Sequence, residues 1–295
     1  MNLRELEYLT AVDEEKNFNR AAERCFVSQP TLSGQLKKLE LELGVKLIER
    51  NTRHVAMTDV GAEVSAQARK VLSEIKKIHE ITQRYEDPMA GELNVGLIPT
   101  VAPYLLPEII PQLKKQFPKL MLWLHEYQTH VLLDMLKKSV LDVLILALPV
   151  DTNEFEEITL FNEPFWLAAP ANQSLSNKRI IDLNALNEQE MLLLEEGHCL
   201  RGQALEVCFV AGARESRAFR ATSLETLRYM VSEGLGMTLM PELAVPKKRL
   251  KTDPIQYIPF KKPEPNRMIG MLYRKESYRA ETFKNMAEVI KNRFR

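Results

Sequence analysis

The run of consecutive apolar residues at positions 143–148, VLILAL, constrains the fold of this chain more than any other stretch. It is short for a helix, and a strand without polar alternation must be covered on both faces. Stretches that also read as strands lie at residues 93–97 and 120–125, and segments with helical spacing separate the three. This alternation predicts a parallel sheet that helices cover on both faces.

A second subdomain of the same kind is expected after residue 164. Its expected elements are strands at residues 192–194 and 236–240 and a helix that begins near Ser223. Residues 269–273 then predict a strand that returns to the first subdomain, before a final helix. We therefore expect a bilobed α/β domain at residues 89–295. The expected subdomains are residues 89–164 with 267–295, and residues 165–266, with a ligand-binding cleft between them.

Residues 1–57 have the pattern of a helix-turn-helix. Apolar residues recur with helical spacing over residues 3–12. Ser28 can cap a later helix at residues 31–43, and Gly44 ends it. This pattern predicts a DNA-binding module whose last helix enters the major groove. The alternative is a small helical packing module with a solvated charged face.

Basic residues dominate this module, although the whole chain has no net charge. From Lys16 to Arg53 there are eight lysines and arginines against four glutamates. These basic side chains can contact the phosphate backbone of DNA. Polar side chains at the start of the last helix can reach base edges. The residues that we expect to contact DNA are Gln29, Pro30, Thr31, Ser33, Gln35, Lys38, Arg50 and Arg53.

Residues 58–88 predict one long helix that Thr58 can cap. Its apolar side chains alternate spacings of four and three, as in a coiled-coil seam. The seam consists of Val64, Ala68, Val71, Ile75, Ile78, Thr82 and Tyr85. We expect this helix to pair two subunits, so that a homodimer presents two recognition helices to a two-fold symmetric site. The alternative is a helix packed onto its own domain.

The composition indicates a globular protein of the cytoplasm. The chain has 295 residues, of which 45% are hydrophobic, so it can bury a sizeable core. We find neither a membrane-spanning apolar run nor a signal-peptide pattern. Three cysteines, an odd number without a secretory pattern, favour a reducing compartment. His125 and His130 have the wrong spacing for a helical metal site, so we expect no metal and no cofactor.

Cys199 and Cys208 lie nine residues apart in the stretch HCLRGQALEVC. If this stretch is helical, a rise of about 1.5 Å per residue separates their Cα atoms by roughly 13.5 Å. A disulfide needs a Cα separation of about 4.4 to 6.8 Å. Either the two cysteines never pair, or pairing destroys the local helix.

The neighbours of these two thiols differ. His198 and Arg201 can stabilise the thiolate of the first cysteine, whereas the second lies between Val207 and Phe209. This asymmetry suggests one attacking and one resolving sulfur. The alternative is that both are small buried hydrophobic residues. We interpret the remaining cysteine, Cys25, as a core residue.

Two segments resemble the LysR-type transcriptional regulators. The run FNRAAERCFVSQPTLSGQLKKLELELGVKLIERNTRHVAMTDVG is similar to the DNA-binding signature of that family. The run EEGHCLRGQALEVCFVAGA, followed by FRATSLETLR, resembles the redox-sensing region of the peroxide-responsive OxyR subfamily. The similarity extends over essentially the whole chain. It implies an α+β multidomain protein with a winged helix-turn-helix, a dimerisation helix and a bilobed effector domain like a periplasmic binding protein.

The resemblance also implies a function and a site. The function is a hydrogen-peroxide sensor that activates oxidative-stress genes through a reversible Cys199–Cys208 disulfide. Its partners would be double-stranded promoter DNA, further copies of the chain in a dimer of dimers, RNA polymerase, and thiol reductants that reset the switch. The implied peroxide site consists of Thr100, Thr129, His198, Cys199 and Arg267. By themselves, Thr100 could be a helix cap and Arg267 a surface charge.

Two other functions stay open on the sequence. The chain could be a LysR-type regulator that binds a small metabolite in the cleft, or a cysteine peroxidase, although the N-terminal module argues against an enzyme. One position departs from the subfamily pattern, because Gly202 stands where we expect an acidic residue. Glycine inside a helix costs about 0.5 to 1 kcal/mol relative to alanine, so we expect a weakened helix in the reduced protein.

Overall fold

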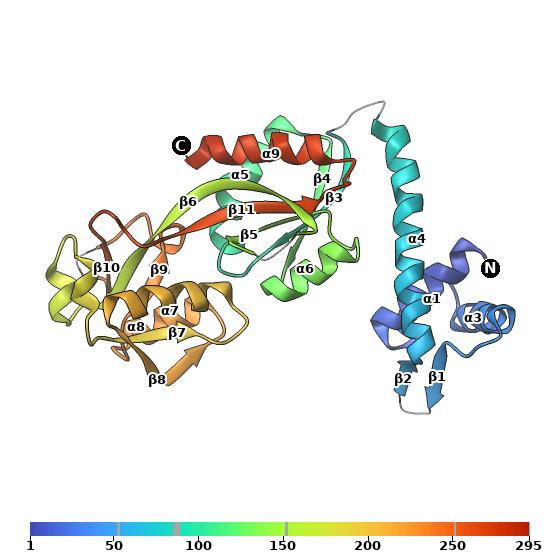
Figure 1. The fold of residues 1–295 in the computed structure, drawn as a ribbon, viewed down its shortest axis with the longest axis horizontal. Coiled ribbons are helices and arrows are strands. Elements are labelled where there is room, and N and C mark those ends of the chain that lie inside the picture. Colours follow the sequence, from blue (N-terminus) through green and yellow to red (C-terminus); the bar gives the residue numbers. More distant parts are fainter. Residues whose placement is uncertain (52–53, 85–88, 151–152, 251, 295) are drawn as a thin grey trace. The chain divides into compact units, whose positions relative to one another are not determined.

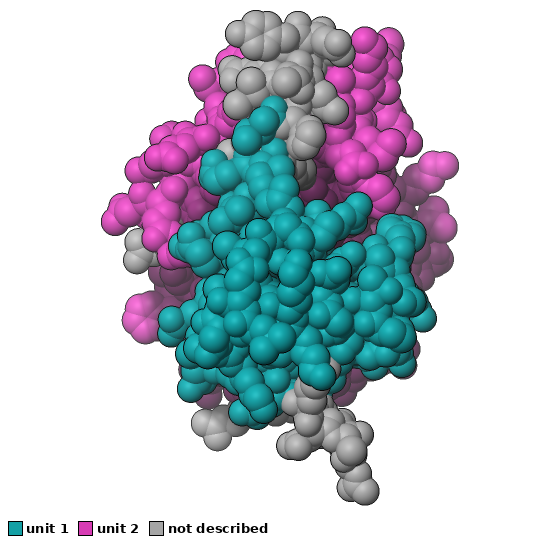
Figure 2. Space-filling view, turned by 90° about the vertical axis from the view of Figure 1, so that its right-hand side faces the viewer, with its two compact units in different colours: residues 1–87 teal, residues 88–295 magenta. Residues whose placement is uncertain are grey.

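The computed structural model describes residues 1–51, 54–84, 89–150, 153–250 and 252–294. The chain forms two compact units, Met1–Asp87 and Pro88–Arg295, which Figure 2 colours separately. In the part of the chain that the structure describes, no helix has the length and apolar character that crossing a membrane requires.

The first unit contains a winged helix-turn-helix (Figure 1). Its helices are α1 (Leu3–Glu15), α2 (Phe18–Arg24) and α3 (Gln29–Leu43). Strands β1 (Ile48–Asn51) and β2 (His54–Met57) follow and pair antiparallel as the wing.

Local sequence explains where α3 begins and ends. The Ser28 side chain accepts a hydrogen bond from the Thr31 N–H, and Pro30 occupies the first turn, where its missing N–H is not needed. The helix therefore begins two residues before the predicted Thr31. Gly44 ends it in the left-handed conformation, as predicted, with φ of 72°.

Helix α4 (Asp59–Arg84) follows the wing, and the Thr58 hydroxyl accepts the Gly61 N–H at 2.9 Å. The predicted seam on this helix has two different environments. Val64 packs against the core of its own unit and Ala68 is buried, whereas Val71 and Ile78 are 38% and 61% exposed. The first half of α4 therefore packs onto its own unit, and the second half presents apolar side chains to solvent. Tyr85 of the seam lies outside the described residues, and the side chain of Thr82 is not described.

The second unit contains two lobes, each with its own core. In the first lobe, the parallel strands β3 (Gly91–Leu97), β4 (Leu120–Glu126) and β5 (Val143–Leu148) confirm the predicted strands. Its helices are α5 (Ala102–Gln116), α6 (Thr129–Lys137) and α9 (Ala280–Phe294). Every residue of β5 is buried, as its unbroken apolar run predicts.

The three strands predicted to be parallel are parallel, and antiparallel strands extend the same sheet. The strand order is β10-β6-β11-β5-β3-β4, with β9 paired to β6, and the long strands β6 (Phe155–Pro170) and β11 (Asn266–Arg274) run antiparallel to their neighbours. Apolar strands look alike in either direction, so their composition did not reveal this. Strand β6 contributes Leu160 to the core of the first lobe and Phe165 to that of the second, so it connects the two lobes.

The second lobe lies between β6 and β11 in the sequence. Strands β7 (Glu190–Leu194) and β8 (Arg214–Ala221) pair parallel, while β9 (Thr238–Pro241) and β10 (Ile255–Pro259) pair with β6. The helices of this lobe are α7 (Cys199–Ala211) and α8 (Leu224–Ser232), with 3-10 helices η1 (Ser174–Asn177), η2 (Leu183–Leu186) and η3 (Glu242–Ala244). Both candidate redox cysteines lie on α7.

Candidate functional site

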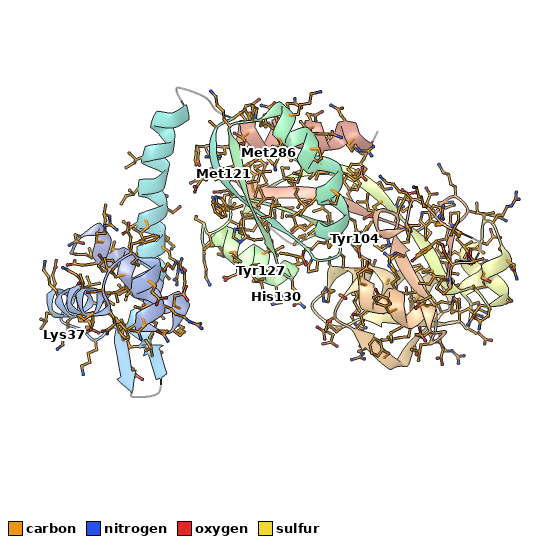
Figure 3. The ribbon with its side chains drawn as sticks, turned by 180° about the vertical axis from the view of Figure 1, so that it is seen from behind. Lys37, Tyr104, Met121, Tyr127, His130 and Met286 are labelled. Atoms are coloured by element: carbon orange, nitrogen blue, oxygen red, sulfur yellow. The ribbon has the colours of Figure 1, made fainter. Side chains whose placement is uncertain are left out.

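The candidate site lies where the parallel strands of the first lobe end. Leu97 of β3 pairs with Glu126 of β4, so Thr100 and Thr129 each follow a paired strand end by three residues. The carboxyl ends of neighbouring parallel strands share one edge of the sheet, which brings both threonines to that edge. Figure 3 labels Tyr127 and His130, which flank Thr129 in the sequence, at the start of α6.

The first turn of α7 reaches the same edge. The Gln203 amide Nε2 donates to the Leu148 carbonyl, at the end of β5, over 3.3 Å. Gly197 lies so close to the Gln128 side chain that a Cβ would stand 2.6 Å from Oε1, and its φ of 95° also favours glycine. Cys199 is half-buried and packs against the core of the first lobe. Helix α7 therefore places one thiol against the other lobe.

Arg267 holds Thr100 in place. Its guanidinium is buried, and Nη1 donates to the Thr100 hydroxyl at 3.0 Å while Nη2 donates to the Thr100 carbonyl at 2.9 Å. The remaining nitrogen, Nε, donates to Glu163 at 2.7 Å. Arg267 is thus not a surface charge. Thr100 is also not the cap of α5, because Val101 occupies that position.

Thr129 carries a buried hydroxyl oxygen that has no hydrogen-bond partner among the described residues. Such a group loses its water on burial without compensation and costs about 1 to 3 kcal/mol. Buried polar atoms without a protein partner often mark the position of a bound polar molecule. An acceptor or donor on a small ligand would satisfy this hydroxyl.

His198 is buried at the N-cap of α7, directly before Cys199. Burial lowers the pKa of the imidazole, and Glu195 opposes this effect only in part. The lowered pKa favours the neutral imidazole, which can donate or accept a hydrogen bond.

The Arg201 guanidinium is bonded to groups other than the Cys199 thiol. Its two terminal nitrogens each donate to a different Glu215 oxygen at 2.9 Å, and Nη1 also donates to the Leu194 carbonyl. The bonds to Glu215 hold the Arg201 pKa above its usual value. Cys199 is the first residue of α7, directly after the His198 N-cap.

Cys208 has the opposite environment. It is buried in the core of the second lobe, and burial raises the pKa of its thiol to about 11. Phe209 is 87% exposed, so it is not the apolar neighbour that the sequence suggested. Instead, Ala204 and Ala211 on the same face of α7 are buried with it. Because Cys199–Ala211 is helical and both thiols are free, the predicted obstacle to a disulfide in the reduced state is present.

Six of the eight residues expected to contact DNA lie on α3. Pro30, Thr31 and Lys38 are exposed, as is Lys37, which Figure 3 labels, while Gln29, Ser33 and Gln35 are half-buried. Lys38 also lies 3.6 Å from the buried Glu5 carboxylate. Arg50 belongs to β1 but its side chain is not described, and Arg53 lies outside the described residues. Helix α3 therefore presents both polar and basic groups to solvent.

The third cysteine, Cys25, packs partly against the core of the first unit, and burial raises the pKa of its thiol. Its neighbour Phe26 is 95% exposed and does not join that core. Throughout the described ranges, no three histidine, cysteine or acidic side chains gather as metal ligands.

Family models and relatives match the two units. Residues 3–62 match the bacterial regulatory helix-turn-helix protein, lysR family, and residues 86–295 match the LysR substrate binding domain. The DNA-binding transcriptional dual regulator OxyR of Escherichia coli K12 is 50% identical over 99% of this chain and 96% of its own length.

Solved structures extend this similarity. A cysteine-to-aspartate variant of full-length OxyR from Pseudomonas aeruginosa has a TM-score of 0.80 and 40% identity, over 99% of this chain and 95% of that one. A cysteine-to-serine variant of OxyR from Corynebacterium glutamicum, with bound hydrogen peroxide, has a TM-score of 0.69 and 33% identity, over 99% and 92% of the two chains. The present chain therefore belongs to the LysR family of bacterial transcriptional regulators and, within it, to the OxyR group.

Proposed function

We propose that this protein is a DNA-binding transcriptional regulator that senses hydrogen peroxide through a reversible Cys199–Cys208 disulfide. The observation that carries the proposal is the position of the two free thiols on α7. One begins the helix and packs against the core of the first lobe, and the other is buried nine residues away in the core of the second lobe. The relatives that carry the name OxyR, one of them with bound hydrogen peroxide, support hydrogen peroxide as the signal.

The chemistry proceeds in two balanced steps. The Cys199 thiolate attacks one peroxide oxygen, the O–O bond breaks, and the departing hydroxide takes a proton to become water. The product is a sulfenic acid on Cys199. The Cys208 sulfur then attacks it, a disulfide forms, and the hydroxyl group leaves as a second water after protonation. Together, one peroxide is reduced to two waters while two thiols are oxidised.

The second step requires α7 to change. The helical Cα separation of roughly 13.5 Å must shrink to below about 7 Å, so the helix has to unwind and Cys208 has to leave the core of the second lobe. The raised pKa of Cys208 keeps this thiol protonated and unreactive until it moves. The disulfide therefore selects a different conformation of the segment, which is what a switch requires.

Within this proposal, residues 1–57 bind promoter DNA, residues 58–88 pair two subunits, and residues 89–295 sense peroxide. Unwinding α7 changes how effector domains meet in a dimer of dimers, and with that the spacing of the recognition helices and the access of RNA polymerase. Thiol reductants of the cytoplasm restore the free cysteines. The reaction needs no bound cofactor, and the sensor reacts once per signal and does not turn over as an enzyme.

Peptide mapping together with DNA footprinting tests this function. After one equivalent of peroxide, we expect a Cys199–Cys208 bond, free Cys25 and a changed footprint that a dithiol reverses. Cys199→Ser protein should keep the reduced footprint, while Cys25→Ser protein, the matched control, should switch normally. A footprint that responds to peroxide in Cys199→Ser protein contradicts the proposal. Consumption of many equivalents of peroxide per subunit with a thiol reductant would instead indicate a peroxidase.

A further inference from the structure

Glu163 and Arg267 form a buried ion pair between the two strands that adjoin the candidate site. They are directly opposite each other on β6 and β11, and their side chains are 1% and 0% exposed. A charge this deeply buried is tolerated only when it is paired and hydrogen-bonded. Glu163 is thus the counter-charge that allows the Arg267 guanidinium to lie within the fold.

The same carboxylate also contacts the second lobe. One of its oxygens accepts from Arg267 Nε at 2.7 Å, and the other accepts the backbone N–H of Leu243, on η3, at 3.0 Å. Two bonds in different directions fix the rotamer of Glu163. Arg267 then has a single orientation, since all three of its nitrogens are bonded: Nε to Glu163 and both terminal nitrogens to Thr100.

This arrangement sets the direction of the Thr100 hydroxyl proton. A threonine hydroxyl has one proton to donate and two lone pairs that accept. Because Nη1 of Arg267 donates to the Thr100 oxygen, the hydroxyl proton must point away from the guanidinium. Thr100 follows the end of β3, at the sheet edge that α7 also approaches through Gln203, so a molecule bound at this edge could accept a hydrogen bond from its O–H.

We propose that Glu163 is a positioning residue for the reaction of Cys199 with peroxide. Acting through Arg267, Glu163 holds the Thr100 O–H where it donates a hydrogen bond to the departing peroxide oxygen as that oxygen gains negative charge. Such a donor, oriented before the reaction, lowers the barrier because it need not reorganise. The inference rests on the proposed peroxide-sensing function and adds to it a residue that does not touch the peroxide.

The rate of Cys199 oxidation tests the role of Glu163. In full-length Glu163→Gln protein, the neutral amide cannot keep both bonds or balance the Arg267 charge. We expect the second-order rate constant with hydrogen peroxide, measured by stopped flow, to fall about tenfold to a hundredfold, the range for one lost hydrogen bond from a charged group. The matched control is Glu157→Gln, since Glu157 lies on the same strand but is exposed. It should react at the wild-type rate.

A double-variant cycle separates positioning from a general loss of structure. In a Thr100→Val background, no hydroxyl is left to orient, so Glu163→Gln should lower the rate little further. Alkylation of Cys199 by iodoacetamide, which needs no donor to a departing oxygen, should proceed at equal rates in wild-type and Glu163→Gln protein. Equal peroxide rates in wild-type and Glu163→Gln protein would overturn the inference, as would full additivity of the two substitutions.

Two further measurements keep the inference testable. If Glu163→Gln protein does not fold, Glu163→Asp retains the charge but is too short to keep both bonds, and we expect a rate several-fold below wild type. A folded Glu163→Asp protein with the wild-type rate then overturns the inference. Wild-type protein whose Cys199 does not react with peroxide would instead contradict the proposed function itself, so the two failures are distinguishable.

Discussion

Arg201 and Glu215 form a bidentate ion pair that joins the first turn of α7 to strand β8. Both nitrogen–oxygen distances are 2.9 Å. The pair is mostly buried and holds the Glu215 pKa below its usual value. In the proposed switch, the pair stabilises the helical, reduced form of the segment, which would have to unwind for the disulfide to form. The proposal therefore links this ion pair to the redox equilibrium of the sensor.

Loss of this pair should favour the disulfide. For Arg201→Gln we expect reduced α7 to lose roughly 1 to 2 kcal/mol, typical of a charged hydrogen-bonded pair. The midpoint potential of the Cys199–Cys208 couple should then become more negative by about 20 to 40 mV. Redox titration against glutathione measures this shift. Arg214→Gln removes the exposed contact with Glu188 and should leave the potential unchanged. An unshifted potential in Arg201→Gln protein would separate the pair from the switch.

Gly202→Ala should act in the opposite direction. A Cβ at this position meets no atom within 4 Å, so alanine fits without strain. It should stabilise the reduced helix by about 0.5 to 1 kcal/mol and make the potential less negative by about 10 to 20 mV. Formation of the disulfide from the sulfenic acid should also slow, which mass spectrometry of quenched samples can follow. Faster closure in the alanine variant would show that unwinding of α7 does not limit this step.

The buried Cys208 thiol predicts a loss of stability at alkaline pH. Its pKa in the folded protein is about 11, above the ordinary value of 9.0, so folding favours the protonated thiol. This contribution is complete below about pH 9 and decreases as the pH rises toward 11. Thermal unfolding of the reduced protein across this range should show a fall in Tm that is smaller in Cys208→Ala protein. Parallel pH profiles for the two proteins would contradict the prediction.

The exposed half of α4 should hold the dimer. Val71 and Ile78 are exposed within the predicted seam, and aspartate at both positions would place unpaired charges in an apolar interface. We expect Val71→Asp, Ile78→Asp protein to sediment as a monomer and to bind operator DNA more weakly. Lys70→Ala, also on the exposed surface of α4, is the control. Persistence of the dimer in the double variant would assign dimerisation to another surface.

Helix α3 should contribute both phosphate contacts and sequence preference. Lys37→Ala removes an exposed charge, so binding should weaken on all sequences and the salt slope should fall by about 1. Thr31→Ala should instead change the ranking of DNA sites, because a short hydroxyl can read a base edge. Salt titrations on an operator and on random DNA distinguish the two effects, with Lys114→Ala in the second unit as the control. If neither variant changes binding, α3 is not the recognition helix.

The sequence by itself determined the elements and the family. Some features depend only on residues within a few positions, so a local sequence pattern predicts them. They are the apolar run of β5, the helix caps at Ser28 and Thr58, and the end of α3 at Gly44. For α7, the sequence allowed only a conditional prediction, that a helix would hold Cys199 and Cys208 too far apart to pair. Interactions between residues that are close in the chain produce periodic patterns or short motifs in the sequence.

Only the tertiary structure decided what the charged side chains do. The Arg201 guanidinium binds Glu215, and burial lowers the pKa of His198. Arg267 bonds to Thr100, 167 residues away in the chain, and to Glu163, which no motif singled out. A long flexible side chain has many conformations of similar energy, and the partner that it selects depends on which strands pair and in which direction. Strand pairing depends on the whole domain, so a local sequence pattern does not predict it.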